Sequence, residues 1–118
     1  MATLTANLTL SGTDLTSDVL NLTVTKALTI SKAVEVKRII TSTTAAAIVS
    51  ASSYTKAWVY VKNIDDTIAM TLVKANGGDI FMALGAEEFA FFPWDTSIDL
   101  MVDAASGSPV LEVAIFEV

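Results

Sequence analysis

The chain has 118 residues, a net charge of −6, and neither cysteine nor histidine. The missing residue types exclude disulfides, thiolate nucleophiles, histidine-based zinc sites and a histidine general base. The acidic balance argues against a nucleic-acid partner, which needs clustered lysine and arginine. We expect no membrane span, because no apolar run reaches about 18 residues, and no signal peptide at the amino end.

The first quarter of the chain alternates between apolar and polar residues. Residues 3–10 place leucine or alanine at even positions and threonine or asparagine at odd positions. This period of two predicts a half-buried strand or an extended arm, and residues 2–10 are our candidate arm for strand addition to a neighbouring chain. After a turn at 11–14, a second strand is predicted from Leu20 to Ile30, with a bulge or short break at Lys26-Ala27.

The middle of the chain predicts strands that become apolar on both faces. Residues 34–40 begin with alternation and end at Ile39-Ile40, where we expect the strand to enter a packed interior. Residues 45–49 fit one helical turn or a buried strand, and their length favours the strand. Residues 56–64 predict a central strand, or a strand with one face against another subunit. A hairpin corner is expected at 63–67.

The remaining residues predict five more short strands. The Asn76-Gly77-Gly78-Asp79 segment has the residues of a tight turn. Phe89 faces away from Phe92 and Trp94, and Pro93 limits how far this aromatic strand pairs centrally. The five strands are predicted at 68–72, 80–84, 89–94, 98–102 and 110–118.

These elements together predict an all-β fold without a convincing helix. Short strands with turn signals about every eight to twelve residues are typical of a sandwich or barrel. The length and the absence of a linker-like segment favour one domain over residues 1–118. We predict a single antiparallel β-sandwich of jelly-roll type with about eight strands, in two sheets of about four.

Carboxylates are the only remaining candidates for metal ligands. Asp95, Asp99 and Asp103 are spaced about 13 Å apart along an extended strand, so they do not share one ion. Together with Asp65-Asp66 they are better explained as turn aspartates. Glu87-Glu88 point to opposite faces of a strand and form no acid–base pair. We therefore predict that the chain is not an enzyme and has no catalytic residue, cofactor or metal site.

The aromatic residues exceed what one buried face of each strand requires. Core packing accounts for about half of them, because one face of each strand must be buried. The surplus favours a subunit interface, and a platform that stacks on sugar rings stays open as an alternative. The predicted interface residues are Leu4, Leu8, Trp58, Tyr60, Phe89, Phe92, Trp94 and Phe116.

Charge is spread unevenly along the chain. Residues 1–62 carry six bases and three acids, a balance of +3, whereas residues 63–118 carry one base and ten acids, a balance of −9. Opposite-signed surfaces could meet head to tail between copies. The alternative is that the two parts are neighbours in one sheet and pair internally.

Short motifs in residues 56–118 resemble small virion proteins of tailed bacteriophages. They are Val61-Lys62-Asn63 before a hairpin, Gly85-Ala86-Glu87 at a loop end, and Pro93-Trp94 at a strand end. These virion proteins include the capsid cement, or decoration, proteins and related accessory proteins, many of which are jelly rolls.

The resemblance implies a structural role in the virion. On this reading the protein binds the outer capsid surface, joins subunits of the major capsid protein, and assembles in the host bacterial cytoplasm. It also suggests a homotrimer seated on a local threefold axis. The alternative is a tail or fibre-associated structural protein that binds carbohydrate on the host surface.

Overall fold

The computed structural model describes residues 2–15, 17–51, 56–75, 78–94 and 98–118, and this part of the chain forms ten strands and no helix. By its contacts the chain divides into two compact units, one of residues 1–32 with Val118 and one of residues 33–117. The strands are β1 (Ala2–Gly12), β2 (Leu20–Ile30), β3 (Val36–Ile40), β4 (Ala46–Val49), β5 (Ala57–Asn63), β6 (Met70–Lys74), β7 (Ile80–Leu84), β8 (Phe89–Trp94), β9 (Leu100–Ala104) and β10 (Val110–Glu117).

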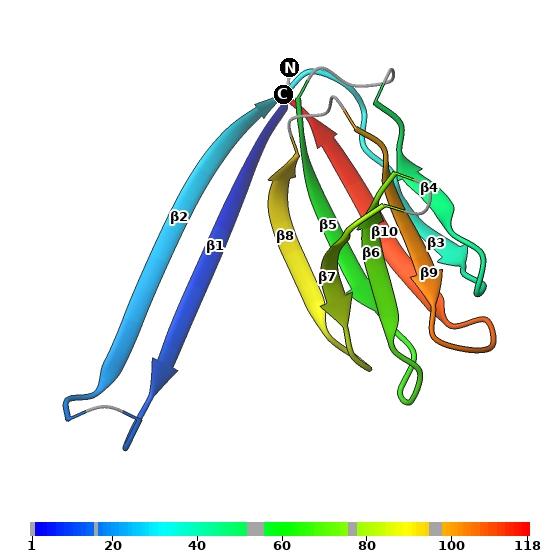
Figure 1. Ribbon diagram of the computed structural model, residues 1–118. Coiled ribbons are helices and arrows are strands. Elements are labelled where there is room, and N and C mark those ends of the chain that lie inside the picture. The colour runs from blue at the N-terminus through cyan, green and yellow to red at the C-terminus, as the bar shows by residue number, and fades with distance from the viewer. Residues whose placement is uncertain (1, 16, 52–55, 76–77, 95–97) are drawn as a thin grey trace. The chain divides into compact units, whose positions relative to one another are not determined.

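Residues 33–117 form an antiparallel β-sandwich, which we call the sandwich. One sheet has the order β3-β10-β5-β8 and the other the order β4-β9-β6-β7. Figure 1 shows the two sheets as separate layers. The predicted all-β class and the antiparallel sandwich with two four-stranded sheets are confirmed, whereas the jelly-roll assignment stays a prediction.

The core of the sandwich lies between the two sheets. Along β5, Val59 and Val61 are fully buried while the residues between them are half-buried, and along β6 Met70 and Leu72 are fully buried. Each aliphatic side chain taken out of water contributes about 1.5–3 kcal/mol. The core cluster comprises Val49, Val59, Val61, Met70, Leu72, Leu84, Phe92, Trp94, Leu100, Val102, Leu111 and Val113.

The segment 63–67 is a crossing between sheets, which corrects the predicted hairpin corner. β5 and β6 belong to different sheets, so the chain changes layers here. Asn63 is fully buried, and its Nδ2 donates to the carbonyl oxygens of Ile68 at 2.8 Å and Gly85 at 3.1 Å. Its Oδ1 accepts from the backbone N–H of Asp65 at 3.0 Å. One side chain thus ties together the connection after β5 and the connection after β7.

The positions of the edge strands decide two of the predictions, those for Ile39-Ile40 and for Pro93. β3 is an edge strand and Ile40 is 75% exposed, so the expected entry of this strand into a packed interior at Ile39-Ile40 is wrong for Ile40. β8 is the opposite edge of the same sheet, as Pro93 predicted, because proline has no N–H to donate to a further strand. β5 lies between β10 and β8, which confirms its predicted central position.

The predicted turn at 76–79 connects two paired strands, although residues 76–77 lie outside the described residues. Lys74 N–H donates to the Asp79 carbonyl at 3.0 Å and Gly78 N–H donates to the Ala75 carbonyl at 3.2 Å. A Cβ on Gly78 would lie 1.6 Å from the Lys74 carbonyl oxygen. Glycine is therefore required at this position.

Residues 1–32 form a two-stranded unit, which we call the hairpin. β1 and β2 pair antiparallel without interruption from Ala2 opposite Ile30 to Gly12 opposite Leu20. The bulge or short break predicted at Lys26-Ala27 is therefore wrong, because both residues are paired with β1 in the uninterrupted ladder. The predicted arm, residues 2–10, lies within β1 and is paired with β2 (Figure 1).

Candidate functional site

The outer face of the β3-β10-β5-β8 sheet carries an aromatic cluster. Because residues directly opposite each other in a sheet share a face, the pairing of β5 with β8 and β10 brings these side chains together. Phe89 is 64% exposed and the others are half-buried. We call this surface the aromatic face, and it comprises Trp58, Tyr60, Phe89, Phe91 and Phe116.

Three of these rings are in contact through Phe91, which is stacked on Trp58 and meets Phe116 edge to face. The centroids of Trp58 and Phe91 lie 5.1 Å apart with the planes at 28°, and those of Phe91 and Phe116 lie 6.2 Å apart at 73°. Such geometries are worth about 0.5–1.5 kcal/mol per pair beyond the buried area. These contacts hold the rings of the aromatic face against one another.

Polar groups lie beside the rings on the same face. The Tyr60 hydroxyl donates to Glu112 Oε1 at 2.8 Å, and Arg38 Nη2 donates to Glu112 Oε2 at 3.4 Å. Partial burial, followed by the hydrogen bond and charge of Glu112, raises the pKa of Tyr60 above its ordinary 10.0. Tyr60 therefore keeps its proton and acts as a donor. This arrangement fixes the orientation of the Tyr60 ring.

Two of the predicted interface residues belong to the core instead. Phe92 and Trp94 are each 9% exposed and pack around Phe81, with ring centroids 5.1 and 5.2 Å from it. Trp94 Nε1 also donates to the Ile98 carbonyl at 3.2 Å. Their parity along β8 is opposite to that of Phe89, so they face the other sheet. Their place in an interface is corrected on this ground.

The structure adds exposed apolar residues to the outer surface that the predicted interface left out. Val36 is 66% exposed and Ile40 is 75% exposed, and both share a face with Arg38 on the edge strand β3. Phe91 stacks within the aromatic face. The signal for Phe91 was its shared parity with Phe89, whereas Ile40 was misplaced because two adjacent isoleucines suggested a two-sided strand.

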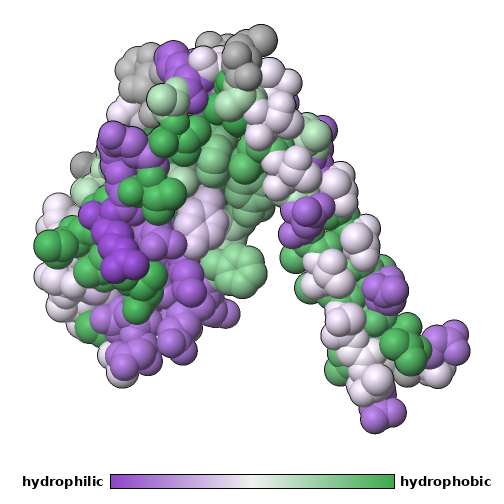
Figure 2. Space-filling view, turned by 180° about the vertical axis from the view of Figure 1, so that it is seen from behind, coloured by the Kyte–Doolittle hydropathy of each residue, from purple (hydrophilic) through white to green (hydrophobic). Residues whose placement is uncertain are grey.

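The hairpin has one apolar and one polar face. Leu8, Leu10, Leu22 and Val24 lie on the same face and are 47%, 47%, 54% and 59% exposed. Of the predicted interface residues, Leu8 is therefore exposed and Leu4 is half-buried. We call this surface, formed by the even-numbered residues of both strands, the apolar face of the hairpin. Figure 2 shows apolar side chains exposed along the hairpin among paler threonines.

The odd-numbered residues of the hairpin form what we call the threonine face. Thr3 lies opposite Thr29, and Thr9 lies opposite Thr23. Asn7 Oδ1 accepts a hydrogen bond from Thr25 Oγ1 at 3.0 Å. Threonine favours strands and tolerates water, so this face needs no cover.

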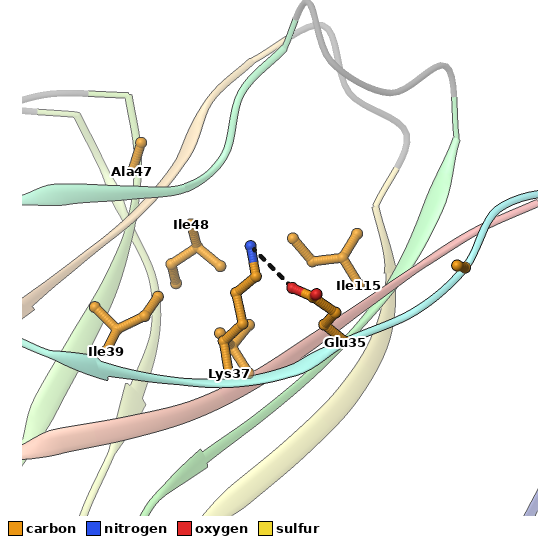
Figure 3. Close-up of a pocket in the computed structure, with 8 residues that line it drawn as sticks. Glu35, Lys37, Ile39, Ala47, Ile48 and Ile115 are labelled. Atoms are coloured by element: carbon orange, nitrogen blue, oxygen red, sulfur yellow. Dashed lines mark ion pairs between the residues drawn. The ribbon is translucent and has the colours of Figure 1, made fainter.

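A pocket of about 400 Å³ opens at one edge of the sandwich, between β3, β4 and β10. Figure 3 shows Ile39, Ile48 and Ile115 lining it, with the side chains of Lys37 and Glu35 directed toward each other. Lys37 Nζ lies 3.8 Å from the carboxylate of Glu35. Both charged side chains are mostly exposed, 66% and 77%. A charged residue facing inward on an edge strand discourages edge-to-edge pairing, which is the role we assign to Lys37.

Two aspartates of the described part of the chain, Asp65 and Asp99, accept hydrogen bonds from backbone groups. Asp65 Oδ1 accepts from the backbone N–H groups of Ile68 at 2.7 Å and Thr67 at 2.8 Å. Asp99 Oδ1 accepts from the Ala51 N–H at 2.7 Å. Asp95 lies outside the described residues. No group of three or more acidic side chains within the described ranges is placed to hold a metal ion.

The two glutamates before β8, Glu87 and Glu88, also take part in hydrogen bonds. Glu87 has a positive φ of 62° and its N–H donates to the Asp65 carbonyl at 3.1 Å. The Glu88 carboxylate accepts from the Gly85 N–H. Both residues therefore shape a turn. Among the described residues no helix is long and apolar enough to cross a membrane.

Comparison of the chain with family models gave no match, and comparisons with curated proteins and with solved structures gave no significant match.

Proposed function

We propose that this chain is a structural protein that works by packing against other protein chains, and specifically a virion component that binds the outer capsid surface. The observation that carries the proposal is the aromatic face. The sandwich already has a complete core without it, so Trp58, Phe89 and Phe116 are not needed to fill the interior. Exposed aromatic surface of this kind is typical of protein interfaces.

The mechanism is mechanical. A rigid sandwich that bridges two subunits of a major capsid protein adds interface area across the joint, and the shell cannot open without breaking that contact. Many copies act together, so a modest contact becomes strong in sum. The copies form homotrimers on local threefold axes and join the shell in the host bacterial cytoplasm.

The strand order supports the jelly-roll part of the proposal. From β3 to β6 the chain changes sheets at every connection, and only β6 and β7 are consecutive strands that pair with each other in the sandwich. A jelly roll also wraps one chain alternately through two sheets.

Binding to shells assembled from the major capsid protein tests the proposal. Trp58→Ser and Phe89→Ser are expected to lower affinity more than tenfold, because they remove apolar anchors without opening the core. Ile80→Ser is the matched control, since Ile80 is 69% exposed on β7 of the other sheet. Equal binding of all three variants would refute the role of the aromatic face, and no binding of the unmodified chain would refute the capsid role.

A second candidate function is carbohydrate binding by a tail or fibre-associated protein. The observation that favours it is the stacked Trp58–Phe91 pair next to the polar Tyr60, Glu112 and Arg38. Because Trp94 lies in the core, Trp58 is the residue to substitute. Glycan binding that is lost in Trp58→Ala, without affinity for capsid shells, would establish this function instead.

A further inference from the structure

Most of the apolar face of the hairpin is open: of its twelve residues only Leu28 and Ile30 are buried, and the others are half-buried or exposed. Residues 1–32 contain two strands, and the uninterrupted pairing directs every even-numbered side chain of both strands to one side. A two-stranded hairpin alone is marginally stable in water, and a third strand or a packed layer is what normally stabilises it. The half-exposed leucines are therefore a surface that a second layer would cover.

The sizes of the side chains on this face differ between the two strands. On β1 the face contains Ala2, Ala6 and Gly12 among its leucines, whereas every residue that β2 contributes is large. Each small residue lies in the row of a large one: Ala2 with Ile30, Ala6 with Lys26, and Gly12 with Leu20. At the last of these rows Leu15 packs over Gly12, where a Cβ would lie 2.5 Å from Leu15 Cδ1. The central depression is thus at Ala6.

We propose that the apolar face of the hairpin packs against the same face of a second copy of this chain, about a twofold axis parallel to the strands. This operation places β1 of one copy over β2 of the other, so that Ala6 receives Lys26 of the second copy and vice versa. At this row a large side chain meets a small one, as interdigitating layers require, while Leu8 meets Val24 and Leu10 meets Leu22 in the neighbouring rows. The inference rests on the proposed function in one respect, namely that the chain acts by association with protein chains.

The other twofold arrangements fit less well. An axis perpendicular to the strands places β2 over β2, where Lys26 meets only large side chains. An edge-to-edge pairing of two hairpins leaves the apolar face uncovered. Stacked sheets cross at about 30° and lie about 10 Å apart, so opposition is closest at the central rows. Those rows are Ala6 with Lys26 and Leu8 with Val24.

Lys26 is the single charge among the twelve residues of the apolar face. Its strand has an unpaired outer edge in the two-stranded sheet, so the aliphatic stem can lie on the partner while the ammonium group reaches water. The two Lys26 groups of the dimer lie diagonally across the twofold axis. Their separation is about one Debye length, so salt reduces their repulsion without removing it.

The available area sets the strength of this contact. Leu28 and Ile30 are already buried, so the open part of the face spans residues 6–12 and 20–26. This part is about 24 Å long and about 10 Å wide, or about 240 Å² of flat footprint per copy. A standard interface buries about 800 Å² per partner. The hairpin contact is therefore weak in solution and forms readily where copies are held close together, as on a shared surface. Because a twofold contact pairs two copies and cannot close a ring of three, it joins copies of neighbouring homotrimers.

Sedimentation of the full chain over a range of about 10 µM to 1 mM tests the contact. Leu8→Thr with Val24→Thr is expected to lower the association constant at least tenfold, while threonine preserves strand pairing. Thr9→Ser with Thr23→Ser changes the opposite face in adjacent rows and should leave association within twofold. Unchanged association of the Leu8/Val24 variant would overturn the proposal.

Ala6→Leu tests whether the contact depends on complementary shape or only on apolar surface. The added side chain occupies the depression that receives Lys26, so association should fall about tenfold although the face becomes more apolar. A strengthened association would overturn the proposed fit. Because the chain has no cysteine, spin labels can also be attached at Thr3→Cys near the base and Ser11→Cys near the tip of the threonine face.

In the proposed dimer, two labels at position 3 lie close together, and so do two labels at position 11. When chains labelled at position 3 are mixed with chains labelled at position 11, the distance between the two different labels is longer. An antiparallel dimer reverses this order and would overturn the inference. The aromatic face is untouched by these variants. Loss of shell binding in Phe89→Ser with intact hairpin association would support the proposed function separately. Intact shell binding of the Leu8/Val24 variant with lost self-association would support the hairpin contact separately.

Discussion

The sandwich and the hairpin are built from the same alternating pattern, with different outcomes. In the sandwich the apolar face of each sheet is buried against the other sheet, and Val59, Leu72 and Leu111 are fully buried. In the hairpin the same parity leaves Leu10 47% exposed and Val24 59% exposed. Alternation thus creates a face in both units, but only a second layer turns a face into a core.

The largest expected difference between the units comes from truncating one leucine in each. Leu72→Ala should lower the free energy of unfolding by about 2–5 kcal/mol, because it opens a cavity between the sheets. Leu10→Ala should cost less than about 1 kcal/mol, because its side chain is half in water. Urea unfolding followed by tryptophan fluorescence measures the first, since Trp58 and Trp94 both lie in the sandwich. Equal losses would mean that the hairpin face is covered.

Removing one asparagine side chain from each unit compares the stability contributed by a buried and an exposed polar group. Asn63→Ala removes the donor shared by Ile68 and Gly85 and should cost about 2–4 kcal/mol, since buried groups lose their partner. Asn7→Ala removes an exposed bond to Thr25 and should cost less than about 0.5 kcal/mol. Amide hydrogen exchange should rise in the sandwich for the first variant only. Similar costs for both would contradict the role of Asn63 as the tie between two crossings.

Tyr60→Phe tests whether the polar pair on the aromatic face contributes to the stability of the fold or to shell binding. It removes the bond to Glu112 but keeps the ring, so stability should fall by about 1 kcal/mol or less and shell binding should change little. Glu112→Gln keeps an acceptor for Tyr60 and serves as control. A loss above about 2 kcal/mol would show that this polar pair holds the sheet together.

Asp65 gives the smallest effect, seen in the pH dependence. The backbone N–H groups of Ile68 and then Thr67 hold the pKa of Asp65 below its ordinary 3.8, with slight burial acting in the opposite direction. The stability from these bonds is complete above pH 3.8 and is lost as the pH falls through the lower folded value. Asp65→Asn should therefore flatten the acid limb of stability below pH 3.8, measured by thermal unfolding. Asp66→Asn is the control, and an identical change in both variants would contradict the assignment.

Several strands could be predicted because their signals are local. Pro93 marked an edge strand, glycine at position 78 marked a tight turn, and the parity of Phe89 against Phe92 was clear from spacing alone. The hairpin corner at 63–67 was misread because nothing in a short polar segment says whether the next strand joins the same sheet. The hydrogen bond from Asn63 to the Gly85 carbonyl marks the crossing between sheets, but Gly85 lies 22 residues further along the chain and the contact cannot be read from the local sequence.

The candidate surfaces were predicted less well than the strands. Tyr60 and Phe89 lie on the outer face and their place in an interface stays a prediction, but Phe92 and Trp94 were included in the interface although their spacing from Phe89 already set both on the opposite face. Parity groups residues into two faces and does not say which of them will be covered. That choice depends on the opposite sheet, which is assembled from strands distant in the chain.

The order of residues by itself determined where strands form, where they turn and which side chains share a face, because these follow from backbone geometry over a few neighbours. Tertiary structure alone decided that β5 lies between β10 and β8, that Trp94 points inward and that the leucines of the hairpin stay half-exposed. The reason is that covering an apolar face is a non-local event, which requires a second layer that period-two spacing cannot specify.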